Sequence, residues 1–268
     1  MRIEPPDPSL YQVLTQSEQE TQCSYIHHTV ELGMFAPVDQ ANHQHWNDVW
    51  SDLNAQLPPG FIRTSNDLVR VNSQFVRPLR SDLELIWYER FRDTVLQTFF
   101  SDTDTIYEFG CGNGWNLVAA QKLYPHKRLV GLDWAPSGLA LLPPSIAAIP
   151  FDFFKPDFNL QLDKSAGVWT VGALEQTGRN WEPFLEYLLH NTPSICVHIE
   201  PIVEWYNAQN PVDLTAIHYH LARHYWMGFP AKMRQLAKQG KVEVIVEQRS
   251  YFGSKDIEGY SLIVWRPI

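Results

Sequence analysis

The chain has 268 residues, of which 44% are hydrophobic, 13% aromatic and 19% charged, a composition typical of globular proteins and unlike that of disordered ones. A net charge of −9 and the lack of a Lys/Arg run argue against nucleic acid as a partner. No apolar stretch approaches the roughly 18 residues of a membrane-spanning helix, so we expect a cytoplasmic protein without a membrane partner. Cys23, Cys111 and Cys196 lack metal-ligand spacing and fit a reducing compartment.

The first eighty residues show only weak periodicity. They are rich in Gln, Thr, His and Pro up to about residue 40, and Trp46, Trp50 and the turn signal Leu57-Pro-Pro-Gly60 follow. We interpret residues 1–80 as an N-terminal extension of helices and loops that covers the functional site.

A second domain is expected from residue 81 to residue 268. Ser81-Asp-Leu-Glu84 has the form of a capping box, and the apolar residues after it recur at helical spacing, which predicts one long helix. This helix should lead into the main sheet.

Past Asp104 the chain alternates short apolar runs with helical segments, which is typical of strand-helix-strand units and a parallel sheet. The predicted strands are 105–109, 128–134, 147–151, 167–171, 195–200, 242–248 and 260–265. The predicted helices are 116–123, a short one near 137–142, 181–190 and a long region at 214–238. Because no helix separates the last two strands, they should pair antiparallel. The sequence predicts an α/β fold in three layers, with a mostly parallel seven-stranded sheet that ends in an antiparallel hairpin.

A glycine-rich loop, Gly110-Cys-Gly-Asn-Gly114, follows the first of these strands and opens a helix. Glycines there let the backbone approach a ligand closely. The spacing Gly-x-Gly-x-Gly, with a bulky Trp115 next, differs from the Gly-x-Gly-x-x-Gly of dinucleotide-binding loops and argues against a nicotinamide-dependent oxidoreductase. Glu108, just before the loop, is placed to attract a cationic group.

Two further strand ends supply groups that suit a nucleoside. Asp133 lies about 20 residues after the loop, the distance at which such folds hydrogen-bond a ribose diol, and Trp134 beside it could cover an adenine face. Asp152 and Phe153 follow the third strand and could meet the amino edge and ring of adenine.

The runs Glu108-Phe-Gly-Cys-Gly-Asn-Gly114, Gly131-Leu-Asp133 and Phe151-Asp152-Phe153 together resemble the class I (Rossmann-like) S-adenosylmethionine-dependent methyltransferases. The resemblance extends from about Thr105 to Ile268. It implies S-adenosylmethionine (SAM) as the cofactor, with Glu108, Gly110, Gly112 and Gly114 along its methionine half. It further implies that Asp133 holds the ribose and that Asp152 and Phe153 border the adenine, with Trp134 as a wall.

In this fold a methyl acceptor should lie beyond the ends of the fourth and fifth strands, and residues 201–239 would form an insertion that builds its pocket. Glu175 follows the fourth strand and could bind the cofactor ammonium or an acceptor hydroxyl. His198 and Glu200 point the same way on the fifth strand, so they could be a base and its orienting carboxylate. The alternative is that both are covered by packed helices.

The segment Thr215–Trp226 is rich in His, Tyr and Arg. At helical spacing His220 and His224 share one face, and either could act as a general base in a lid over the acceptor. One His pair does not complete a metal site, so we expect no metal.

Together these features predict methyl transfer to a hydroxyl or carboxylate oxygen of a small polar metabolite, such as a sugar or a natural-product intermediate. Other functions remain open. One keeps the fold but changes the chemistry, to N-methylation of a small amine or to aminopropyl transfer. The other is a non-catalytic sensor or structural protein that binds SAM.

Overall fold

The computed structural model of the chain describes residues 2–38, 43–51 and 67–268, so the turn predicted at 57–60 lies outside the described residues. The main sheet has seven strands in the order β6-β5-β4-β7-β8-β11-β9. In chain order they are β4 (Thr105–Phe109), β5 (Arg128–Asp133), β6 (Ala147–Pro150), β7 (Ala166–Val171), β8 (Ile195–Glu200), β9 (Val242–Gln248) and β11 (Ser261–Pro267). These bounds agree closely with the predicted ones, because a strand covered on both faces is a continuous apolar run.

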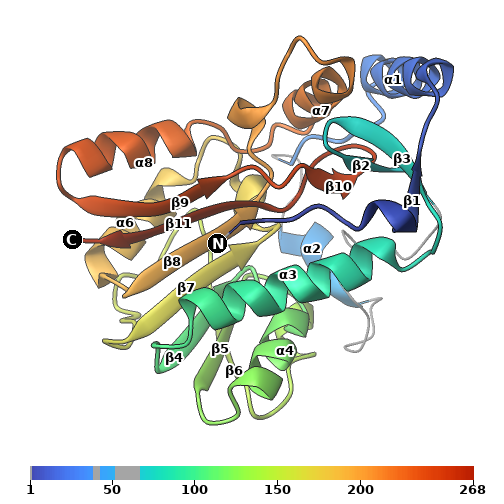
Figure 1. Cartoon of the computed structure of the whole chain (residues 1–268). Coiled ribbons are helices and arrows are strands. Elements are labelled where there is room, and N and C mark those ends of the chain that lie inside the picture. The colour runs from blue at the N-terminus through green and yellow to red at the C-terminus, as the bar shows by residue number, and fades with distance from the viewer. Residues whose placement is uncertain (1, 39–42, 52–66) are drawn as a thin grey trace.

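The strands β4 to β8 run parallel, and β11 pairs antiparallel with β8 on one side and β9 on the other. The chain fills the sheet from β4 out to β6 and then returns to place β7 on the other side of β4. At such a reversal the loops after neighbouring strands diverge and leave a crevice in which open α/β sheets bind ligands. The predicted Rossmann-like α/β fold is confirmed, including the antiparallel pair at the sheet edge (Figure 1).

The helices are α1 (Gln16–Glu31), α2 (His43–Ser51), α3 (Leu83–Phe99), α4 (Trp115–Leu123), α5 (Pro136–Leu139), α6 (Glu182–Asn191), α7 (Pro211–Ala222) and α8 (Phe229–Lys238). Short 3-10 turns are η1 (Pro8–Leu10), η3 (Leu174–Thr177) and η4 (Val203–Trp205). The region predicted as one long helix at 214–238 is two helices, because His224 and Gly228 between them have φ of 54° and 87°. The predicted capping box at 81–84 is also wrong: Asp82 is the N-cap residue, and its carboxylate pairs with Arg80 instead of capping the helix.

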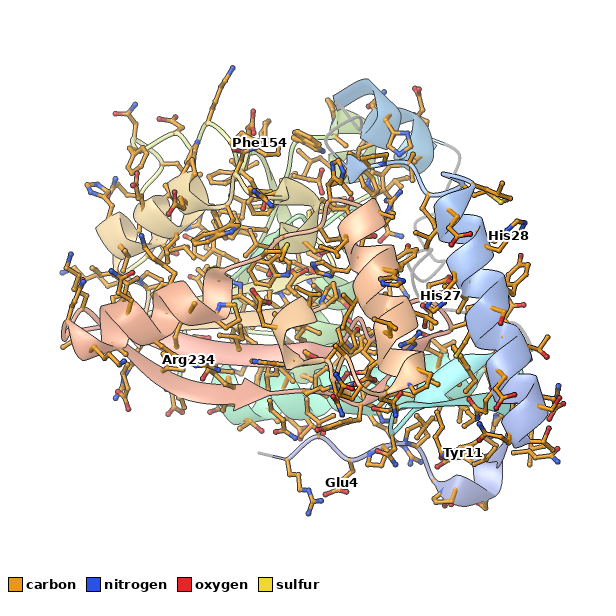
Figure 2. All side chains as sticks on the ribbon, turned by 90° about the horizontal axis from the view of Figure 1, so that it is seen from above. Glu4, Tyr11, His27, His28, Phe154 and Arg234 are labelled. Atoms are coloured by element: carbon orange, nitrogen blue, oxygen red, sulfur yellow. The ribbon has the colours of Figure 1, made fainter. Side chains whose placement is uncertain are left out.

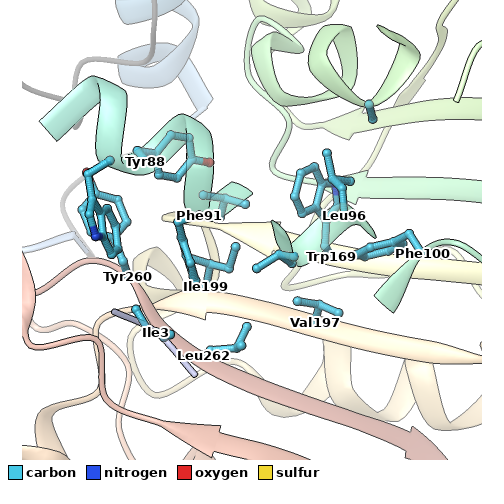
Figure 3. Packing of buried hydrophobic residues seen from close by; sticks show 14 of the residues in the cluster. Ile3, Tyr88, Phe91, Leu96, Phe100, Trp169, Val197, Ile199, Tyr260 and Leu262 are labelled. Carbon is cyan, nitrogen blue, oxygen red and sulfur yellow. The ribbon is translucent and has the colours of Figure 1, made fainter. Parts of the chain in front are cut away.

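Side chains of the central strands alternate between two apolar layers. Ile106 packs into a layer with α3 and α4, whereas Tyr107 and Phe109 pack against α6. Figure 1 shows α3 and α4 crossing in front of the sheet. Figure 3 shows part of the same layer, in which Phe91 of α3 lies over Ile199 of β8. The sheet and its two helical layers form the three-layer sandwich that the sequence predicts.

A second, four-stranded antiparallel sheet has the order β1-β3-β2-β10. Its strands are β1 (Tyr11–Val13), β2 (Val69–Val71), β3 (Gln74–Pro78) and β10 (Phe252–Ser254). Three of them come from the first eighty residues. The fourth, β10, lies in the sequence between β9 and β11 of the main sheet. The first eighty residues therefore share a sheet with the C-terminal part of the chain, which their weak periodicity does not indicate.

Helix α1 packs against α7 beside this second sheet. Cys23 and Ile26 of α1 are buried in a small core together with Phe75 and Val212. His27 faces α7, whereas its neighbour His28 points away from it (Figure 2). None of the helices in the described ranges is long and apolar enough to cross a membrane.

Candidate functional site

A crevice with two adjoining cavities lies beyond the carboxyl ends of the parallel strands. The small cavity, of about 70 Å³, is lined by Gly110, Asp133, Trp134 and Phe153. The large cavity, of about 700 Å³, shares Trp134 with it and is also lined by Asp152. Together they reach the roughly 300–1,000 Å³ that is typical of ligand sites. Five residues predicted to contact the cofactor thus meet in one crevice, from the ends of β4, β5 and β6.

The glycine loop has a backbone conformation that depends on its glycines. Gly110, Gly112 and Gly114 have φ of 72°, 51° and 71°, in the left-handed region that side chains disfavour. A Cβ atom on Gly110 would lie 2.3 Å from the Cβ atom of Ala173, in the loop after β7. With glycines at these positions, the loop backbone can approach its neighbours, or a ligand, more closely than it could with any other residue type. It ends at the N-terminus of α4.

The Asp133 carboxylate holds this loop in place. Its Oδ2 accepts the Gly112 N–H at 2.9 Å, and its Oδ1 accepts the Ala135 N–H at 2.9 Å. Burial raises the pKa of Asp133, although these hydrogen bonds oppose the shift. Because a carboxylate oxygen can accept a second hydrogen bond, Asp133 can still take a ligand hydroxyl from the small cavity that it lines.

Glu108 lines neither cavity, and its side chain extends from β4 to α4. Its Oε1 accepts the Asn116 side-chain amide at 2.8 Å, and the Tyr88 hydroxyl donates to the oxygen of the same amide at 2.9 Å. Its Oε2 has no hydrogen-bond partner among the described residues. Burial raises the pKa of Glu108 to about 8. Glu108 therefore lies beneath the glycine loop and not in the crevice. Its contact with the cofactor remains a prediction.

Helix α2 of the N-terminal extension lies over the glycine loop. Trp46 and Trp50 line the small cavity, and a Cβ atom on Gly112 would lie 2.2 Å from the Trp50 ring. The Ser137 N–H donates to the Asn47 side chain at 3.1 Å, which joins α2 to α5. The sequence motifs do not place these tryptophans at the site. Their spacing of four residues, which places both rings on one helix face, is the signal that could have indicated it.

The loop after β7 carries Glu175 and is held by Glu200 at the end of β8. The Glu200 carboxyl oxygens accept the backbone N–H groups of Ala173 at 3.1 Å, Leu174 at 3.1 Å and Glu175 at 3.3 Å. Burial, together with the charge of Glu175, raises the pKa of Glu200 well above its ordinary value. Glu200 therefore holds its proton more tightly than an ordinary glutamic acid, and its carboxyl group is hydrogen-bonded to that of Glu175.

His198 and Glu200 do not form the predicted pair of base and orienting carboxylate. Trp265 Nε1–H donates to His198 Nε2 at 3.0 Å, so the ring proton is on Nδ1, which donates to Thr170 Oγ1 at 3.0 Å. Thr170 in turn hydrogen-bonds Glu200. Burial lowers the pKa of His198 to about 3. His198 thus helps to orient Glu200 inside the sheet, and both of its ring nitrogens are engaged by the protein.

His220 and His224 do not share a helix face, because α7 ends at Ala222. His220 is buried, its Nε2–H donates to the Trp226 carbonyl at 2.7 Å, and burial lowers its pKa to about 4. His224 is exposed and lines the large cavity. Of the three imidazoles predicted as bases, only His224 therefore reaches the crevice. Within residues 2–38, 43–51 and 67–268, no group of three or more His, Cys, Asp or Glu could hold a metal ion.

Comparisons with known proteins give structural likenesses and no family. No protein-family model matches the chain, and no curated protein matches its sequence. LepI in complex with SAM is 16% identical over 66% of this chain and 46% of that chain, with a TM-score of 0.45. The N,N-8-amino-8-demethyl-D-riboflavin dimethyltransferase RosA from Streptomyces davawensis is 13% identical over 70% of this chain and 57% of that chain, with a TM-score of 0.46. Human N-acetylserotonin methyltransferase in complex with SAM is 15% identical over 68% of this chain and 55% of that chain, with a TM-score of 0.44.

The chain spans about half the length of these three proteins. By its own strand order and crevice it is a Rossmann-like α/β protein.

Proposed function

We propose that this chain is a SAM-dependent methyltransferase with a small-molecule acceptor. The convergence of Gly110, Asp133, Trp134 and Phe153 on one cavity at the strand ends carries the proposal. These residues fit an adenosine group, because they combine close backbone approach, a carboxylate for hydroxyls and aromatic walls. The adjoining large cavity supplies the space that the small one lacks under Trp50. The loop spacing and its resemblance to class I methyltransferases support SAM over a dinucleotide.

When bound, SAM supplies a methyl group activated by its sulfonium. The residues of the chain then have to align an acceptor with that methyl group and exclude water. Glu175 and His224 are the predicted catalytic residues that line cavities of this region. Either can take the proton of a hydroxyl or an ammonium, whereas a carboxylate acceptor needs no base. Transfer to oxygen and transfer to nitrogen are both compatible with this pair.

Calorimetric titration of the full chain with SAM, S-adenosylhomocysteine and NAD tests the proposal. We expect both adenosyl compounds to bind and NAD not to bind. Gly110→Ala should weaken SAM binding at least tenfold, because the added methyl group meets Ala173 and φ is 72°. Gly240→Ala is the matched control, since Gly240 has φ of 70° and an added Cβ atom would meet nothing within 4 Å. Its SAM affinity should equal that of the native chain.

The result that would overturn the proposal is failure of the native chain to bind either SAM or S-adenosylhomocysteine. Tighter binding of NAD than of SAM would also overturn it and would favour an oxidoreductase. Thermal unfolding of both alanine variants, measured alongside, separates a loss of binding from a loss of fold.

A further inference from the structure

Two basic side chains, Lys155 and Arg179, line the large cavity of the crevice. We call them the basic pair. Lys155 follows β6 and Arg179 follows β7, so they reach the cavity from opposite sides of β4 in the sheet order. Both side chains are exposed to solvent. The wall of this cavity therefore carries positive charge, although the chain as a whole has a net charge of −9.

A turn after β6 fixes the backbone of Lys155. Asp152 Oδ1 accepts the Phe154 N–H at 2.8 Å, and the Asp152 carbonyl accepts the Lys155 N–H at 3.2 Å. The Phe154 ring lies beside the Trp134 ring, with centroids 5.8 Å apart, and both rings line the same cavity. The Lys155 side chain therefore starts from a hydrogen-bonded turn next to an aromatic wall.

The loop that carries Arg179 is held against the segment after α7. The Trp226 N–H donates to the Glu175 carbonyl at 3.0 Å. Gly178, directly before Arg179, has φ of 58°, and a Cβ atom on it would lie 3.0 Å from the His224 carbonyl oxygen. The glycine thus lets the two segments approach closely. Both members of the basic pair are therefore attached to backbone that the fold holds in place.

The charged ends of the basic pair are not engaged by the protein. Within residues 2–38, 43–51 and 67–268, neither the Lys155 ammonium nor the Arg179 guanidinium has a hydrogen-bond or ion-pair partner. Every other arginine of these ranges except Arg90 has at least one. A guanidinium with all its donors available at a cavity suits a carboxylate or a phosphate, whose oxygens match its planar geometry.

The charge balance of the cavity wall favours an anion. Among the described residues that line the cavity the one carboxylate is that of Asp152, and it forms no ion pair with Lys155 or Arg179. The two permanent cations outnumber it, and His224 adds a further positive charge whenever its ring is protonated. A cleft whose wall carries an excess of one charge concentrates ligands of the opposite charge.

The rest of the wall suits the carbon skeleton of an organic molecule. Trp134 and Phe154 supply aromatic surface on one side of the cavity, and Leu221 and Met227 supply aliphatic surface on the other. Ligand sites typically combine such apolar surface with a few polar groups that fix orientation. An organic molecule with an anionic group would use both parts of this wall.

We propose that the large cavity binds an organic anion, a carboxylate or a phosphate ester, through Lys155 and Arg179. The loop after β7 and the end of α7 form one side of this cavity, and the methyl acceptor is expected there. The anion is then the acceptor, an identification that rests on the proposed function. A neutral metabolite or a cationic amine would leave the basic pair without a counter-charge.

The test compares two anions, sodium benzoate and disodium phenyl phosphate, with neutral benzamide by ligand-observed NMR titration of the full chain at constant ionic strength. We expect at least one anion to bind about tenfold more tightly than benzamide, and the tighter of the two distinguishes a carboxylate from a phosphate. Arg179→Gln and Lys155→Gln should each weaken binding of that anion about fivefold and leave the benzamide affinity unchanged.

Arg90→Gln is the matched control. Arg90 is also exposed and also lacks a side-chain partner among the described residues, but it lies on α3 and does not line the large cavity. Its anion affinity should equal that of the native chain. Benzamide that binds as tightly as both anions overturns the inference. An equal loss in Arg90→Gln and Arg179→Gln, or native anion affinity in both variants of the basic pair, also overturns it. Circular dichroism checks that each variant is folded.

S-adenosylhomocysteine separates this inference from the proposed function. Added at saturation, it should leave the anion bound, because a methyl acceptor and the cofactor occupy the crevice together. Displacement of the anion by S-adenosylhomocysteine overturns its identification as the acceptor. A chain that prefers the anion but binds neither SAM nor S-adenosylhomocysteine supports the basic pair as an anion site and overturns the methyltransferase function.

Discussion

Glu108 illustrates how burial changes a single ionisable group in this fold. Burial raises its pKa from 4.5 to about 8, against the opposing effects of the Asn116 hydrogen bond and the charge of Arg92. In the unfolded chain the same carboxyl loses its proton near pH 4.5. The folded state therefore binds more protons than the unfolded state between these two values. The stability that this group contributes is full below about pH 4.5 and is lost as the pH rises to about 8.

Glu108→Gln should consequently gain stability relative to the native chain as the pH rises. Glutamine keeps an oxygen that can accept the Asn116 hydrogen bond but does not ionise. The difference in unfolding free energy between variant and native chain, from urea titrations, should shift in favour of the variant from about pH 5 to about pH 9. The shift is at most roughly 5 kcal/mol. A difference that does not change with pH would show that the pKa of Glu108 is not raised.

The sequence allows some site residues to be predicted and not others. Gly110 and Asp133 are predictable because their roles depend on local backbone conformation and on their place at a strand end. The surroundings of His198 are not, since its donor Trp265 lies 67 residues further along the chain. A polar residue on a buried strand has the same sequence pattern whether helices cover it or a ligand site opens beside it.

At the scale of elements, the main sheet is predictable because its strands are continuous apolar runs separated by helices. The second sheet is not, since β1, β2 and β10 have three residues each, too few for alternation to be recognised. Its register also depends on pairing between β2 and β10, which are far apart in the chain. Such strands are defined by their partners rather than by their own sequence.

The ion cluster around Arg249 joins α7 to the segment between β10 and β11. Arg249 Nη2 lies 2.6 Å from Asp213 Oδ1, and Arg249 Nε lies 2.6 Å from Glu258 Oε2. All three side chains are at most 8% exposed. Arg249→Met should lower the unfolding free energy by about 3–5 kcal/mol, because it leaves two carboxylates buried without their cation. Chemical denaturation at neutral pH measures the loss.

Arg266→Met is the matched control for this cluster. Arg266 pairs with Glu243 at 2.6 Å, but the two side chains are 54% and 49% exposed. Solvent screens such a pair, so its loss should cost less than about 1 kcal/mol. Equal effects of the two substitutions would mean that the Arg249 cluster adds no more to stability than a surface ion pair.

At the scale of the whole molecule, strands from both halves of the chain build the second sheet. Phe252 of β10 pairs with Val71 of β2, across the boundary that the sequence suggests near residue 80. Arg70 of β2 is fully buried and donates to the Thr215 hydroxyl at 2.9 Å and the Lys255 carbonyl at 2.8 Å. Because these hydrogen bonds cross between the two parts, neither part can unfold without exposing the other.

We therefore expect urea to unfold the full chain in a single transition, with the same midpoint by far-ultraviolet circular dichroism and by tryptophan fluorescence. Arg70→Met should lower the free energy of unfolding by roughly 2–5 kcal/mol, because it leaves buried acceptors without a donor. The urea midpoint should fall accordingly, and the transition should remain single. Arg77→Met in β3 is the control: Arg77 and its partner Glu18 are each 47% exposed, so the cost should stay below about 1 kcal/mol. Two separate transitions in the native chain, or an Arg70→Met variant in which only one signal shifts, would show instead that the first eighty residues fold as an independent unit.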